Sequence, residues 1–184
     1  MASNHPVRPD RLSPDGRAFP GMQILIWPGH HDPLDAAIKF FTHGRGSHAA
    51  FLRLDGCTVH EAFWPAVRDR PLTVEDCKLV EVYHLAGLSD THHLRFERLF
   101  DSNLRQHIKY SFLDLVRFAL NRPNPDERHT FCSRYVMHCC EAILPVAFLP
   151  LVRLPYRDWA SPRDLRISPR LILAKEYFAS PNQL

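Results

Sequence analysis

Cys132 is the residue of this chain best placed to act as a nucleophile. It lies in the segment 130–140 (TFCSRYVMHCC), directly after a loop rich in proline and asparagine at 121–126. From there to Leu144 apolar residues recur at every third or fourth position, which predicts a helix with Cys132 in its first turn. The N–H groups and positive dipole at that end favour an anion, so this thiol is expected to ionise more readily than a free cysteine. A small buried apolar residue is the alternative interpretation.

A predicted β-hairpin supplies a histidine and a carboxylate. Two segments rich in apolar and β-branched residues flank Asp55-Gly56, the dipeptide that a two-residue turn prefers. The predicted pairs are Leu54 with Cys57, Leu52 with Val59, Ala50 with Glu61, and His48 with Phe63. Because opposed residues share a face, His48 and Glu61 become diagonal neighbours, within reach of each other directly or through a water.

Together these three side chains have the composition of a nucleophilic catalytic site. The thiolate of Cys132 would attack a carbonyl carbon, His48 would accept and return the proton, and Glu61 would orient the imidazole. N–H groups at the helix N-terminus would stabilise the oxyanion. His60 is expected on the opposite face of the hairpin and is left out of the site. We therefore predict hydrolysis or acyl transfer at an amide or ester through an acyl-Cys132 intermediate.

Three further residues are candidates for substrate binding. Tyr110 could donate a hydrogen bond to the oxyanion, although a tyrosine that opens an amphipathic helix is often a packing residue. Arg45 and Arg134 flank the predicted site and could bind an acidic group of the substrate. The alternative for both arginines is a solvated surface position.

No metal or organic cofactor is predicted. Three groups that contain histidine are candidates for metal binding: His30-His31, His92-His93, and His138 with Cys139 and Cys140. None has the paired-ligand spacing that is typical of zinc sites. Cys139 follows Cys132 by two helical turns, which places it deeper in the core rather than beside the first thiol.

The elements that must position these residues form a single α+β domain over residues 21–184, after a flexible, proline-rich tail at residues 1–20. Besides the hairpin, the patterns predict strands at 22–27, 79–84 and 171–174, and helices at 33–44, 90–108, 112–120 and 132–144. Frequent prolines after 144 favour an extended wrap. We expect an antiparallel sheet with helices packed on one side, the cysteine helix lying against the strands of His48 and Glu61.

Composition excludes several classes of protein. At 184 residues, 45% hydrophobic and 23% charged, the chain has ordinary globular composition, and no apolar run is long enough for an integral membrane segment. A net charge of +3 is too small to indicate nucleic acid. Five cysteines and the lack of a signal-like N-terminus favour a cytoplasmic protein, or export without a cleavable signal peptide. Oligomeric state stays open.

Short motifs resemble the permuted papain-like group of the NlpC/P60 superfamily, and in particular its YiiX-like members. They are 46–51 (GSHAAF) at a strand start, 59–62 (VHEA) on the next strand and 131–136 (FCSRYV) at a helix start, in the order histidine, acid, cysteine. The resemblance covers roughly residues 21–175 and includes Lys109-Tyr110 before a helix. Two features depart from the group: Gln23 stands where its first strand often begins with Gly-Asp, and the stretch from Tyr110 to Cys132 is longer than expected.

The resemblance implies a circularly permuted papain-like fold, with Cys132 as nucleophile, His48 as base and Glu61 as the orienting residue. It also implies a substrate class: a peptide or peptidoglycan fragment with an amide bond, or, as a related possibility, a lipid acyl group. An acyltransferase, a lipid amidase or esterase, and a non-catalytic binding module on the same scaffold are the alternatives to an amide hydrolase.

Overall fold

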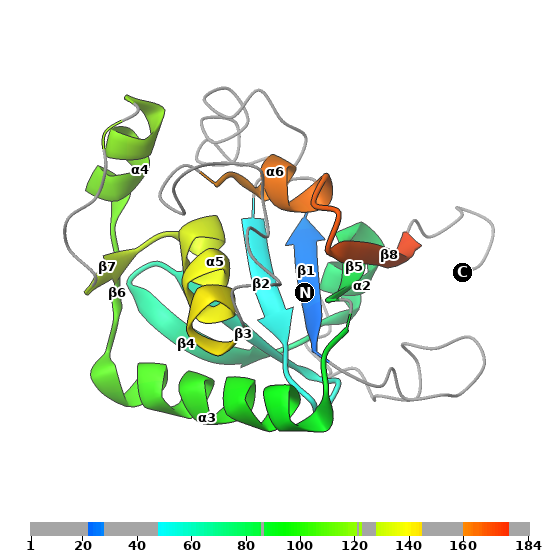
Figure 1. Ribbon diagram of the computed structural model, residues 1–184. Helices are drawn as coiled ribbons and strands as arrows, with labels where there is room; N and C mark the ends of the chain where they lie inside the picture. Colours follow the sequence, from blue (N-terminus) through cyan, green and yellow to red (C-terminus); the bar gives the residue numbers. More distant parts are fainter. Residues whose placement is uncertain are drawn as a thin grey trace.

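The computed structural model describes residues 22–27, 48–85, 87–120, 122, 128–144 and 160–176. One curled sheet dominates it, with the strand order β7-β6-β4-β3-β2-β1-β5-β8 (Figure 1). The strands are β1 (Gln23–Trp27), β2 (His48–Leu52), β3 (Thr58–Phe63), β4 (Ala66–Pro71), β5 (Glu81–Leu85), β6 (Lys109–Tyr110), β7 (His129–Thr130) and β8 (Leu171–Glu176). Neighbouring strands are antiparallel except β6 and β7, which are parallel.

Five helices accompany the sheet in the described part of the chain: α2 (Val74–Leu79), α3 (Asp90–Gln106), α4 (Phe112–Ala119), α5 (Cys132–Ile143) and α6 (Pro162–Arg166). The N-caps of α2, α3, α4 and α6 are the hydroxyl residues Thr73, Ser89, Ser111 and Ser161, and each accepts a hydrogen bond from its own first turn. Helix α5 differs, because its N-cap Phe131 has no side-chain acceptor. The first turn of α5 is thus left without a side-chain cap.

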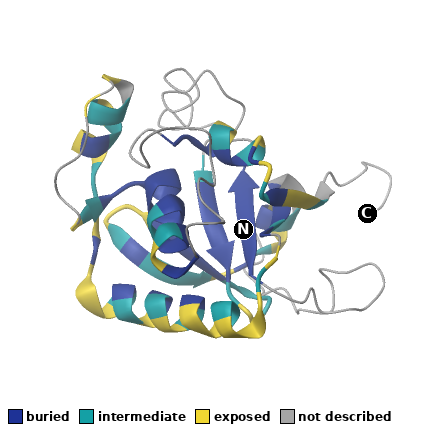
Figure 2. Ribbon diagram, in the orientation of Figure 1, coloured by how far each residue is buried: buried dark blue, intermediate teal, exposed yellow. Residues whose placement is uncertain are grey.

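Apolar residues cover both faces of the central strands. On one face, Ile24, Ile26, Ala49 and Phe51 pack with α3 and α5. On the other, a cluster comprising Leu25, Trp27, Ala50, Leu52, Val59, Leu72, Val80 and Val82 packs with Cys77 of α2. The expectation of helices on one side only is therefore wrong. Strands β1 and β2 read as nearly continuous apolar runs because both of their faces are buried (Figure 2).

The hairpin has the predicted register next to its turn but a different turn, and the predicted pairs Ala50 with Glu61 and His48 with Phe63 are not formed. Leu52 pairs with Val59, as predicted, and Phe51 pairs with His60. The N–H of Arg53 donates to the carbonyl of Thr58, so residues 54–57 form a four-residue loop with Gly56 at φ 68°. The predicted two-residue turn and its closing 54–57 pair are wrong. A four-residue loop spans the same point of the hairpin symmetrically, and so the register is unchanged.

Several other predicted elements were tested. Helix α3 begins after Ser89, as predicted, and ends two residues early, where His107 caps it in the left-handed region at φ 50°. The strand predicted at 79–84 is instead β5, from 81 to 85, because 79 ends α2. Strand β8 is confirmed and is longer than expected, and α6 is a helix within the segment predicted to be extended. The tail 1–20, the helix predicted at 33–44 and most of the wrap, 145–159, lie outside the described residues.

Candidate functional site

Cys132 is the first residue of α5, which packs on β2 and β3. The ladder between β2 and β3 ends at the Phe51–His60 pair, so the two strands are not paired further toward His48. There the backbone N–H groups of Ala49 and Ser133 donate to the sulfur of Cys132. The hydroxyl of Ser133 donates to the carbonyl of Ala160 at 2.7 Å, which fixes the start of α5. The thiol is therefore held by backbone donors from a strand and from its own helix.

All five cysteines are free, but only Cys132 has a lowered pKa. Burial alone would raise the pKa of its thiol; the hydrogen bond and the positive charge of His48, with the two backbone donors, lower it below the ordinary value. Burial instead raises the pKa of Cys77 to about 11 and of Cys139 to about 12. The thiolate is thus favoured at Cys132, relative to an ordinary cysteine, and disfavoured at Cys77 and Cys139.

His48 lies between the thiol and a carboxylate. Its Nε2 is 2.9 Å from Oε2 of Glu61, which leaves Nδ1 as the ring nitrogen facing the sulfur of Cys132. Rings of Trp27 and Phe63 pack against the imidazole at centroid distances of 5.3 and 5.8 Å. Burial would lower the pKa of His48, but hydrogen bonds to Cys132 and Glu61 and their negative charges raise it to about 9. A thiolate and an imidazolium therefore stabilise each other.

Glu61 is almost fully enclosed, with its side chain 1% exposed, and is paired with three cationic groups. Besides His48, Nε of Arg68 at 2.9 Å and Nε of Arg70 at 3.0 Å donate to its Oε1. Burial would raise the pKa of Glu61; the hydrogen bond and charge of His48 and the two guanidinium groups lower it to about 2. This carboxylate stays ionised at any pH at which the protein would work.

The two arginines come from β4, an element that was not predicted, and they were missed as part of the site. Arg70 also binds Asp76, at 2.6 and 3.0 Å, and Asp76 completes the capping box of α2 with Thr73. Through Arg70 and Asp76, Glu61 is thereby connected to the start of helix α2. The signal in the sequence is the spacing of Arg68 and Arg70, two residues apart on the strand after Glu61, which places both on the face of Glu61 once β3 and β4 pair.

The three predicted substrate-binding residues have different positions. Tyr110 lies close to the thiol: burial and the negative charge of Cys132 raise the pKa of its phenol, which keeps the O–H as a donor. Arg134 is 3% exposed and donates to the backbone carbonyl of His129, so its guanidinium is built into the protein and is poorly placed to meet a substrate. Arg45 lies outside the described residues. His60, on the other face as expected, bonds Tyr135 and Asp69 in the core.

Among the described residues, no helix combines the length and apolar composition needed to cross a bilayer.

The fold is similar to that of a solved structure described as "metalloprotein yiiX from Escherichia coli O157:H7, DUF1105". The TM-score is 0.63 at 18% sequence identity, over 86% of this chain and 98% of that chain. No family model matches the sequence, and no curated protein does. At this identity the likeness concerns the fold, which is consistent with the YiiX-like arrangement expected from the motifs.

The description of that structure as a metalloprotein raises the question of a metal in this chain. Over the residues that the structure describes, no group of three or more His, Cys, Asp or Glu side chains is arranged to hold a metal ion. Cys132 and His48 lie together, but Nε2 of His48 is already hydrogen-bonded to Glu61. The carboxylate of Glu61 in turn accepts hydrogen bonds from Arg68 and Arg70. Two guanidinium groups beside the nearest carboxylate disfavour a further cation. This donor set does not fit a metal.

Proposed function

We propose that this chain is a cysteine-dependent hydrolase of amide bonds with a permuted papain-like catalytic site of the NlpC/P60 type. The observation that carries the proposal is the continuous chain from Cys132 through His48 to Glu61, which contains the one cysteine of five whose pKa is lowered. A peptide, including a peptidoglycan fragment, is the proposed substrate.

The reaction would begin from the thiolate and imidazolium pair. The sulfur of Cys132 attacks the carbonyl carbon of the amide, and the C=O π electrons move to the oxygen, where N–H groups of the first turn of α5 and the O–H of Tyr110 stabilise the charge. As the C–N bond breaks, imidazolium His48 gives its proton to the leaving amine, and an acyl-Cys132 thioester remains.

Hydrolysis of the thioester would restore the enzyme. Neutral His48 accepts a proton from water while the water oxygen bonds to the acyl carbon, and the C–S bond then breaks to release the acid and the thiolate. Glu61 keeps Nδ1 of the ring directed at the sulfur and stabilises the imidazolium in both half-reactions. Its two arginines hold the carboxylate in place and keep it ionised.

The test is turnover of a panel of peptide and muropeptide amides by the wild type and by Cys132→Ala and His48→Ala variants. Each variant is expected to lose at least about a thousandfold of kcat/KM, since nucleophile and base act as one unit. Cys139→Ala is the matched control, because it removes a thiol from the same helix without touching the site, and its turnover should be unchanged. Full activity of Cys132→Ala would reject the nucleophile. A binding module without catalysis would bind panel members and turn none over.

A second candidate, an acyltransferase or hydrolase of lipid amides or esters, is favoured by the apolar side chains beside the site. Phe63, whose ring contacts His48, is 40% exposed, and the next residue, Trp64, is 59% exposed. Helix α4 begins two residues after Tyr110 and projects from the body of the molecule, with its apolar residues largely at the surface (Figures 1 and 2). Phe112, Leu113, Val116 and Leu120 are 44%, 60%, 52% and 62% exposed and follow one stripe of this helix.

Turnover of acyl esters in micelles separates the two candidates. For a lipid substrate, Leu113→Ser and Val116→Ser should lower kcat/KM for the micellar ester at least about tenfold and leave a short soluble ester unaffected. Leu94→Ser is the matched control, because Leu94 is 55% exposed on α3, in another element. Equal losses in all three variants, or no preference for micellar over soluble ester, would leave the amide hydrolase as the function.

A further inference from the structure

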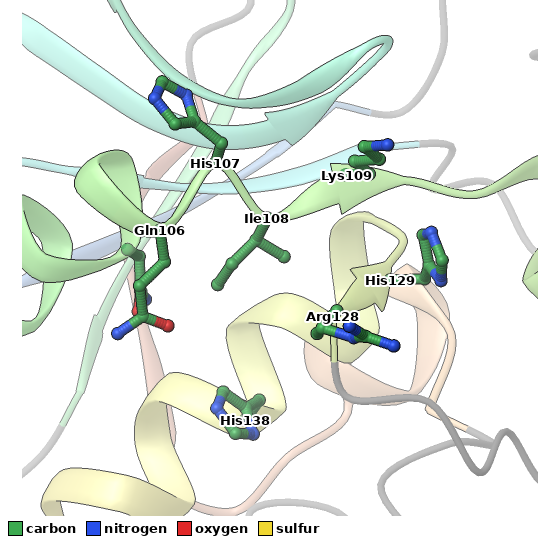
Figure 3. Close-up of a pocket in the computed structure, with 8 residues that line it drawn as sticks. Gln106, His107, Ile108, Lys109, Arg128, His129 and His138 are labelled. Carbon is green, nitrogen blue, oxygen red and sulfur yellow. The ribbon is translucent and has the colours of Figure 1, made fainter.

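A hollow lies away from Cys132, between the C-terminal end of α3, strands β6 and β7, and the middle of α5 (Figure 3). It has a volume of about 640 Å³, within the range of small-molecule sites. Its described lining is Asn103, Gln106, His107, Ile108, Lys109, Arg128, His129 and His138. Of these eight residues, five carry or can carry a positive charge, and none is acidic.

The backbone places three of these basic residues side by side. Lys109 and His129 are directly paired in the parallel ladder of β6 and β7, and the N–H of Lys109 donates to the carbonyl of Arg128 at 3.1 Å. Lys109, Arg128 and His129 are therefore fixed at neighbouring backbone positions. His138 reaches the hollow from α5, opposite Gln106 and Ile108 (Figure 3).

A buried hydrogen-bond network joins α3 and α5 beside the hollow. The side-chain amide of Asn103, which is 3% exposed, donates to the hydroxyl of Tyr135 at 2.8 Å. The same hydroxyl is 2.7 Å from Nε2 of His60, whose other ring nitrogen is 2.5 Å from Asp69. This buried network connects α3, α5 and the sheet, so the two helices that border the hollow keep their separation.

We infer that this hollow binds a phosphate-type anion carried on a small molecule. Positively charged groups gathered at one concave surface attract an anion, and an anion with several oxygens can meet more than one of these groups. A guanidinium offers a planar fork and an ammonium a point charge, and both suit phosphate oxygens. The volume exceeds what a bare phosphate fills, and Ile108 supplies an apolar contact for the organic part.

Calorimetric titration tests the inference, with inorganic pyrophosphate as the probe in a phosphate-free buffer of low ionic strength. Saturable binding at one site is expected in the wild type, and at least tenfold weaker binding in a Lys109→Ala/Arg128→Ala variant. Arg95→Ala/Arg98→Ala is the matched control, because it removes two exposed cations from α3 outside the lining. Its affinity should stay within about twofold of the wild type. A Cys132→Ser variant should bind like the wild type, since the hollow does not include the thiol.

Three results would overturn the inference: no saturable binding by the wild type, unchanged affinity in the double variant, or an equal loss in the α3 control, which would mean attraction by net charge alone. Arg128→Glu provides a second variant at an exposed position, and it should abolish binding without a change in circular dichroism. Titration of adenosine 5′-monophosphate beside orthophosphate then separates the two sources of the anion. Tighter binding of the nucleotide is expected, and binding of orthophosphate alone would reject the organic part of the ligand.

Discussion

Replacing Glu61 by glutamine is the sharpest test of how the thiol is activated. The substitution keeps the shape of the side chain and removes the charge that is 2.9 Å from Nε2 of His48. A hydrogen bond between charged groups contributes about 1.5–3 kcal/mol, which corresponds to about one to two units in the pKa of the imidazolium. Arg68 and Arg70, left without their carboxylate, act in the same direction by repelling the imidazolium. The pKa of His48 should therefore fall from about 9 to about 7 or 8.

The reactivity of the Cys132 thiol measures this change in the pKa of His48. With a weaker imidazolium partner, the pKa of Cys132 should rise, so the rate of alkylation by iodoacetamide should fall and its pH profile should move toward higher pH by up to about two units. The difference should shrink at the highest pH, where the thiol is ionised more fully in both proteins. The assay is the second-order rate constant of alkylation from pH 5 to 10, with mass spectrometry to assign the modified cysteine. Glu141→Gln, the same replacement on the helix of Cys132, is the control and should follow the wild-type profile.

Arg68→Gln should change the pKa of His48 in the direction opposite to Glu61→Gln. It removes a cation from Glu61 and from the neighbourhood of His48, so the imidazolium should be slightly favoured, with an effect of about threefold or less because the Arg68 side chain is 41% exposed and screened. An unchanged profile in Glu61→Gln, or the same slowing in Glu141→Gln, would refute the idea that a buried carboxylate sets the state of the pair.

Three further predictions concern pH and stability. Turnover should rise as pH passes the lowered pKa of Cys132 and fall near pH 9 as His48 loses its proton, which a kcat/KM profile measures. The pKa of Glu61 is about 2 in the folded chain and higher in the unfolded chain, so ionised Glu61 stabilises the fold by about 3 kcal/mol. This contribution is present above about pH 4.5 and is lost as the pH falls toward 2. Urea unfolding at pH 5 and pH 3 should show the loss in the wild type and much less of it in Glu61→Gln. Tyr135→Phe should cost about 1–3 kcal/mol in urea unfolding, because Asn103 and His60 lose a buried partner, while alkylation of Cys132 stays unchanged.

Local signals in the sequence predicted much of the scaffold. Ser89 marks the start of α3, and the pattern after residue 131 gives α5 with Cys132 in its first turn, as the structure has it. The register of the hairpin followed from Asp55-Gly56 and the alternation of its strands. Strand β4 was missed because Arg68, Asp69 and Arg70 interrupt the apolar alternation that identifies a strand. These charged side chains pair with the buried residues Glu61, His60 and Asp76, and the alternation of a single strand does not encode such pairing.

The sequence pattern could not predict the anion-binding hollow or the burial of both faces of the sheet. The hollow combines residues 103, 106–109, 128–129 and 138, whose approach depends on how α3 packs against α5. Helix α2 packs Cys77 against the second face of the sheet, although its six residues carry too short a pattern to be recognised. Both features arise from packing between elements that are distant in the chain.

By itself, the sequence determined where α5 begins and which way His48 and Glu61 face, because caps, turns and side-chain periodicity act over a few residues. The tertiary structure alone decided that the sulfur of Cys132 meets the imidazole of His48. It also decided the sign of the shift in the pKa of Cys132. Burial opposes the thiolate, as the raised pKa of Cys139 on the same helix shows, and a cationic partner brought from a remote strand reverses that effect.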